Sequence, residues 1–131
     1  MREILYKGKP KNELIDWVYG YYFYSELTCK HCIMGESKDY GYNCIEVIPE
    51  TVGQYTGLKD KNGTKIFEGD IIRVFDVWCG GVKKVVWWES EASFKLSKDG
   101  KTYLCLDTAI EKGCKVIGNI HDNPELLNAE D

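Results

Sequence analysis

The sequence predicts an all-β fold: a small barrel with peripheral hairpins. Long helical periodicity is scarce in the 131 residues. Short alternating runs follow one another between turn residues instead, as in small sandwiches and barrels, and about seven or eight strands are expected. The length suits one domain over residues 1–131. Within it we expect N-terminal strands and a variable loop over 1–48 and the barrel core over 49–127.

The first strands are predicted where β-branched and aromatic residues gather, in segments 2–8, 16–27 and 44–49. Pro49 should stop the third of these, because proline cannot donate a hydrogen bond to a strand ladder. The intervening stretch 28–43 is polar and contains glycine, which predicts a loop or a loose hairpin.

Turn residues divide the middle of the chain. Asn62-Gly63 predicts a tight type I′ hairpin, since both residues tolerate the positive φ that this turn needs. Glu68-Gly69-Asp70 predicts a second turn before a strand over 70–78. Gly80-Gly81 predicts another hairpin turn, leading into strand 82–90.

The C-terminal third continues the pattern with strands over 92–97 and 101–106, separated by an Asp99-Gly100 turn. Residues 107–113 predict a helical turn that Asp107 or Thr108 caps and Gly113 ends. A last strand, 114–120, precedes a closing helical turn with Asn123 as N-cap and Pro124 at its first position.

Charge argues against a general nucleic-acid binder. The net charge is −4. Lysine and arginine form no cluster beyond Lys83-Lys84, whereas binding to phosphate backbones depends chiefly on such clusters. No apolar run approaches the roughly 20 residues that span a bilayer, and the first residues lack the apolar core of a secretory signal. We therefore expect a cytoplasmic protein with no membrane partner.

Cys29 and Cys32 form a Cys-x-x-Cys pair, which can supply two corners of a tetrahedral zinc site. A second matching pair is missing, so zinc would need an irregular set that includes Cys44 and His31. The alternative is two thiols on a turn, with no cofactor. A redox role is disfavoured, because no helix follows to lower a thiol pKa.

The densest aromatic run, 17–24, predicts a contact surface. Alternation places Trp17, Tyr19, Tyr21 and Phe23 on one side of a strand. Residues 12–28 contain no lysine or arginine, so base stacking is a weaker interpretation than core on one side and a partner on the other. Trp87 and Trp88 must point to opposite faces, which leaves one of them in need of cover; Trp88 is the predicted anchor of an oligomer.

Catalysis is not predicted. Glu68, Asp70 and Asp76 could be a carboxylate cluster for acid–base work or Mg²⁺, but glycine and aspartate in this order are typical of a turn. The sequence places no nucleophile or basic partner beside them. His121 is interpreted as a surface or capping group.

Several motifs in a fixed order resemble the YopX family of phage and prophage proteins. They are "MREILYKGK", "DWVYGYY", "ETVGQYTGLKDKNGTKIFEGDIIRV", "VVWWESEASFKL" and "VIGNIHDNPELL". Residues 25–45 depart from that pattern. The resemblance implies a barrel of the Src-homology-3-like type, closed or partly open, a phage origin with expression in a bacterial host, and self-association. It implies no chemistry, since a fold alone does not give a function.

We therefore expect a non-enzymatic phage or prophage accessory protein that acts by protein–protein contact. Its predicted surface comprises Trp17, Tyr19, Tyr21 and Trp88, and its partners are a second copy and an unidentified phage or host protein. Two alternatives stay open: a nucleic-acid-binding regulator that uses an open barrel face, and a binding module stabilised by zinc at Cys29 and Cys32.

Overall fold

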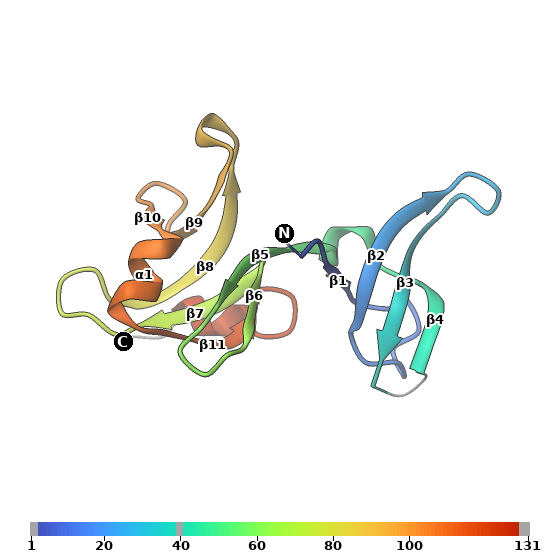
Figure 1. The fold of residues 1–131 in the computed structure, drawn as a ribbon, viewed down its shortest axis with the longest axis horizontal. Helices are drawn as coiled ribbons and strands as arrows, with labels where there is room; N and C mark the ends of the chain where they lie inside the picture. The colour runs from blue at the N-terminus through green and yellow to red at the C-terminus, as the bar shows by residue number, and fades with distance from the viewer. Residues whose placement is uncertain (1–2, 39–40, 129–131) are drawn as a thin grey trace. The chain divides into compact units, whose positions relative to one another are not determined.

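The computed structural model describes residues 3–38 and 41–128. These residues divide into two compact units, 1–55 and 56–131. Both are built mainly from antiparallel strands (Figure 1). The prediction of a mainly β protein is therefore confirmed. The predicted organisation as a single domain over 1–131 stays a prediction.

The first unit is built on a meander of four strands in the order β4-β3-β2-β1. These are β1 (Tyr6–Gly8), β2 (Val18–Ser25), β3 (Lys30–Ser37) and β4 (Gly41–Glu46). A short 3₁₀ turn, η1 (Pro49–Thr51), then leads to the start of β5 (Gly53–Lys59), which pairs with β1. The segment predicted as a polar loop or loose hairpin contains β3, and β3 pairs with β2 along all eight residues.

One face of this meander is a closed apolar core. Val18, Ile33 and Val47 are fully buried there, and Tyr6 and Tyr22 pack at its margin. Two glycines let the strands approach on this face: Gly20 lies opposite Gly35, and a Cβ on Gly35 would lie 1.9 Å from the Tyr19 carbonyl oxygen. The alternation of β2 therefore sends Tyr19, Tyr21 and Phe23 to the other face.

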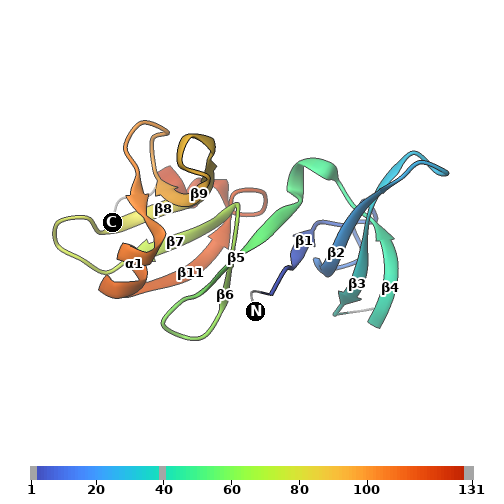
Figure 2. The ribbon, with the colours of Figure 1, turned by 45° about the horizontal axis from the view of Figure 1, so that its top comes forward.

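The second unit contains a five-stranded sheet in the order β10-β9-β8-β7-β11. Its strands are β7 (Asp70–Val74), β8 (Gly81–Trp88), β9 (Ser93–Ser97), β10 (Leu104–Cys105) and β11 (Cys114–Asn119). The helix α1 (Leu106–Lys112), orange in Figure 2, follows β10 and lies beside β9 and β10. Its Leu106 and Ala109 are buried with Ile72, Val85 and Leu96.

The remaining elements of this unit are short. The end of β5 pairs with β6 (Lys65–Phe67), η2 (Glu89–Glu91) joins β8 to β9, and η3 (Pro124–Asn128) follows β11. The closing helical turn at Pro124 is thus present. Gly113 ends α1 with φ 95° as predicted, but the N-cap is Cys105 rather than Asp107 or Thr108.

The barrel is not confirmed, because neither sheet closes among the described residues. The outer edge of β11 is met by a loop: the Lys61 N–H donates to the Cys114 carbonyl, and the Asp60 carboxylate accepts the Val116 N–H at 2.9 Å. These single bonds occupy the edge where a further strand would have to pair to close a barrel. Strand β10 at the opposite edge is only two residues long.

The hairpin at Asn62-Gly63 forms, but its turn is not type I′. Among non-glycine residues that the structure describes, only Cys29 and Ala92 have positive φ, so Asn62 does not. The loop instead runs from Asp60 to Thr64, which are joined by a backbone hydrogen bond of 2.9 Å, with Gly63 at φ 82°. Three-residue loops of this kind need positive φ at one position only.

Candidate functional site: an exposed aromatic sheet face

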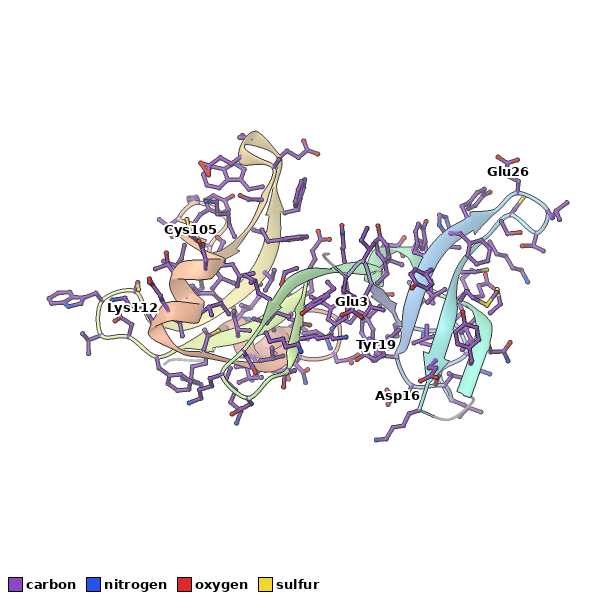
Figure 3. All side chains as sticks on the ribbon, viewed as in Figure 1. Glu3, Asp16, Tyr19, Glu26, Cys105 and Lys112 are labelled. Carbon is purple, nitrogen blue, oxygen red and sulfur yellow. The ribbon has the colours of Figure 1, made fainter. Side chains whose placement is uncertain are left out.

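The second face of the β2–β3–β4 meander is rich in exposed apolar side chains. We call it the aromatic face and define it by five residues with their exposed fractions: Tyr19 (44%), Tyr21 (61%), Phe23 (38%), Met34 (36%) and Tyr42 (64%). Strand register places them together. Tyr21 on β2 lies opposite Met34 on β3, and Tyr42 on β4 lies opposite Glu36 on β3. Tyr19 projects from the lower part of β2, while Glu26 marks the tip of the β2–β3 hairpin (Figure 3).

Two of the four predicted contact residues, Tyr19 and Tyr21, belong to this face. Trp17 precedes β2 and is half-buried, with the Lys7 ammonium 4.8 Å from its ring centroid. Trp88 lies in the second unit on β8, half-buried and stacked on Tyr103 at 4.4 Å. The four residues therefore belong to two different units, and their role in binding stays a prediction.

Sequence reasoning missed Met34 and Tyr42. Both lie in the stretch interpreted as a loop or a loose hairpin, and for Met34 the short apolar run 32–34 was the available signal of a buried strand. It also favoured Trp88 over Trp87, although Trp87 is the more exposed of the two, at 45%. Trp87 contacts Phe94 on the neighbouring strand, edge to face, at 5.0 Å.

The charges beside the aromatic face are balanced. The Glu46 carboxylate lies 3.1 Å from the Lys11 ammonium and 3.6 Å from that of Lys30. Hydrogen bonding to Lys11, more than any other contact, lowers the pKa of Glu46. The glutamate is thus ionised at neutral pH and offsets the nearest cations.

The aromatic face ends at β4, the outer strand of its sheet among the described residues. The Val47 N–H donates to the His31 carbonyl, so position 47 belongs to the hydrogen-bonded pairs of this ladder. By alternation, the backbone groups of Tyr42, Cys44 and Glu46 point away from β3. Lys11 donates its N–H to the Glu46 carbonyl, and the Asn43 side chain accepts the Cys44 N–H at 2.8 Å. A groove of about 330 Å³ follows this edge, lined by Lys11, Asn12, Ile15 and 43–46.

The two cysteines of the predicted zinc pair lie in different environments, Cys29 before β3 and Cys32 within it. Cys29 is exposed in the turn before β3, at φ 56°, and its thiol donates to the Glu26 carbonyl at 3.8 Å. Cys32 lies on β3 and is buried. His31 points to the opposite face of the strand, where its Nδ1 is hydrogen-bonded to the Tyr22 hydroxyl. Among the residues described, no three His, Cys, Asp or Glu side chains are placed to share a metal ion, and the pair stays a prediction.

Cys32 has a different sulfur neighbour. Its thiol donates to the Lys30 carbonyl at 3.9 Å and interacts with Cys44 on β4: burial, followed by the charge of Cys44, raises the pKa of Cys32. Cys44 is exposed.

The carboxylates considered for catalysis act within turns. The Asp70 carboxylate is buried and accepts the Phe67 N–H at 2.8 Å. The Asp76 carboxylate accepts the N–H groups of Trp78 and Cys79, and the bond to Cys79 leads the contacts that lower its pKa. These bonds hold the β7–β8 loop while Val77 and Trp78 remain about nine-tenths exposed.

No helix in the described part of the chain is long and apolar enough to cross a membrane.

Comparison with known proteins identifies the family. The fold resembles the crystal structure of protein EF1440 from Enterococcus faecalis, with a TM-score of 0.65 and 21% identity, over 97% of this chain and 99% of that one. No curated protein matches the sequence. The family model described as YopX protein matches residues 9–128. The chain therefore belongs to the YopX family.

Proposed function

We propose that this protein is a non-enzymatic interaction module that self-associates through the aromatic face and the adjoining edge of β4. In keeping with the resemblance to phage and prophage proteins, it would serve as an accessory protein in the cytoplasm of a bacterial host. The observation that carries the proposal is the gathering of five large apolar side chains on one exposed sheet face, each at least 36% exposed.

Such a face is costly to leave in water. Scattered exposed apolar residues are normal on a protein surface, whereas a contiguous patch is typical of an interaction site. Tyrosine suits this use, because it offers a large contact area with few rotatable bonds and a hydroxyl that tolerates water. Three of the five residues are tyrosines.

A second copy is the occupant that fits best. An exposed strand edge can pair with a strand of another chain, and β4 extends the sheet that carries the aromatic face. In a two-fold arrangement each surface must complement itself. The aromatic face meets this condition, since the Lys30–Glu46 pair presents both signs of charge at its margin.

Nucleic acid is a weaker candidate for the same face. Exposed rings on an open sheet can stack on bases, but a positively charged groove normally accompanies them. Here Lys30 is paired with Glu46, and Lys7, opposite Tyr19, is buried over the Trp17 ring.

Sedimentation velocity over a wide concentration range tests the proposal. The wild type should associate reversibly, and the double variant Tyr21→Glu/Tyr42→Glu should be monomeric at concentrations where the wild type is not. Trp78→Glu is the matched control, because it changes an aromatic side chain that is 93% exposed outside this face. A wild type that stays monomeric at high concentration, or an equal effect of the control, refutes the proposed surface.

A further inference from the structure

Two thiols meet within the aromatic face. Cys32 on β3 and Cys44 on β4 project from the same side of two paired strands, and the proximity of Cys44 contributes to the raised pKa of Cys32. Register explains the contact: Cys32 pairs with Glu46 and Met34 pairs with Cys44, so the two cysteines are diagonal neighbours on one face. The other described cysteines lie elsewhere, on the turn at 29 or in the second unit.

A third sulfur lies at the same place. Met34 is directly opposite Cys44 and two residues from Cys32, so all three project from the same face. Because Val47 and His31 form a hydrogen-bonded pair, Met34 and Cys44 form a non-hydrogen-bonded pair, the kind whose side chains approach most closely. Sulfur ligands from two adjacent strands thus converge without any irregular backbone.

Strand geometry favours a bridging ion over a disulfide. Diagonal positions on an antiparallel pair are about 7–8 Å apart, at or beyond the roughly 7 Å limit for a disulfide without backbone movement. Two metal–sulfur bonds of about 2.3 Å each reach further than one S–S bond of about 2 Å. A metal ion between the sulfurs therefore fits the strands as they stand.

The donor set selects the kind of ion. Zinc requires four ligands in a structural site, and the described residues offer no cluster of three or more His, Cys, Asp or Glu. Thiolate and thioether ligands are soft and select Cu(I) and similar ions. The neighbours on β2 are Phe23, opposite Cys32, and Tyr21, opposite Met34, which give the sulfurs an apolar flank.

We propose that Cys32, Cys44 and Met34 form a binding site for one soft monovalent metal ion such as Cu(I). Binding displaces two thiol protons to the solvent and leaves a net charge of −1 on the two thiolates and the ion. Burial and the charges of Cys44 and Glu46 raise the pKa of Cys32, and the nearby Lys30 ammonium offsets only part of this effect. Cys44 is exposed and receives the ion first, and the buried Cys32 completes the pair.

Anaerobic competition for Cu(I) against bathocuproine disulfonate tests the site on the full-length reduced protein. One equivalent should be withdrawn from the coloured complex. Cys44→Ser should weaken binding by at least the about 10- to 100-fold that loss of a supporting residue costs at metal sites, and Met34→Leu should weaken it less. Cys44→Ser is preferred to a change at the buried Cys32, because an exposed position leaves the core intact.

Cys29→Ser is the matched control, since it removes a thiol three residues from Cys32 that lies outside the site. In a second readout, Ag(I) should protect Cys44 from alkylation by iodoacetamide while Cys29 in the same molecule remains reactive. The proposal is overturned if the wild type withdraws no copper, if Cys44→Ser binds as tightly as the wild type, or if Cys29→Ser weakens binding equally.

Discussion

Replacing Asp60 by asparagine should destabilise the second unit, because this carboxylate joins three backbone amides. One oxygen, Oδ1, accepts the N–H groups of Asn62 and Thr64, and Oδ2 accepts that of Val116, each at 2.9 Å. An asparagine has one accepting oxygen, so at least one amide would then face an NH₂ group. Asp60 is buried, at 7% exposed. Hydrogen bonds to charged groups contribute about 1.5–3 kcal/mol each, and water can replace part of the loss at the exposed loop amides. We therefore expect a loss of about 2 kcal/mol from the free energy of unfolding.

Equilibrium urea unfolding followed by circular dichroism measures this loss, and amide hydrogen exchange at Val116 locates it. Asp99→Asn is the matched control. Asp99 accepts the amides of Lys101 and Thr102 with a single oxygen in an exposed loop, and an asparagine can keep both bonds. Equal midpoints for Asp60→Asn and the wild type, or an equal loss in the control, would show that the bond to Val116 does not stabilise the unit.

Three further outcomes are expected. Stability should fall as the solution is acidified below about pH 5. Burial raises the pKa of Asp60, but the three backbone hydrogen bonds to its carboxylate outweigh burial, so the pKa is lowered overall. The contribution of Asp60 to stability is therefore present above its unfolded-state pKa and is lost as the pH falls through its folded-state pKa. An acid titration of the unfolding midpoint should show a shallower slope for Asp60→Asn. Gly35→Ala should lower the free energy of unfolding by about 1–3 kcal/mol, because the new Cβ would overpack against the β2 backbone. Gly63→Ala should cost less, because its Cβ would meet nothing within 4 Å and only the positive φ of this position is unfavourable; thermal unfolding ranks the two variants. Leu96→Ala, at a fully buried position, should cost about 2–5 kcal/mol, and urea unfolding of the second unit checks it.

Local chemistry predicted much of the fold. Alternating apolar residues located most of the strands, and Gly113 ended the helix for the expected reason. For β3 the sequence left a loop and a loose hairpin open, because Lys30, Gly35 and Glu36 are typical of a loop. Its strand character depends on pairing with β2 on one side and β4 on the other.

The barrel and the site were harder to predict because both depend on register. A closed barrel requires an edge strand to find a partner, and no local pattern showed that the Asp60 loop would occupy the edge of β11. Likewise, Cys44 and Met34 meet Cys32 only through the β3–β4 pairing. Sequence spacing therefore suggested Cys29 as the partner of Cys32. The sequence did predict the alternation of β2, and with it the exposure of Tyr19 and Tyr21.

The position of β11 has a consequence for synthesis on the ribosome. Strand β7 lies between β8 and β11, and the Asp60 carboxylate accepts a hydrogen bond from the Val116 N–H, 56 residues further along the chain. A nascent chain that has emerged only as far as β9 already contains most of the apolar residues of this unit. One edge of β7 then still lacks its partner strand, β11. Such long-range pairing forms slowly, and until it forms the unpaired strand edge is prone to aggregation. Of the five strands of this sheet, the last to leave the ribosome is thus the one that pairs with the free side of β7.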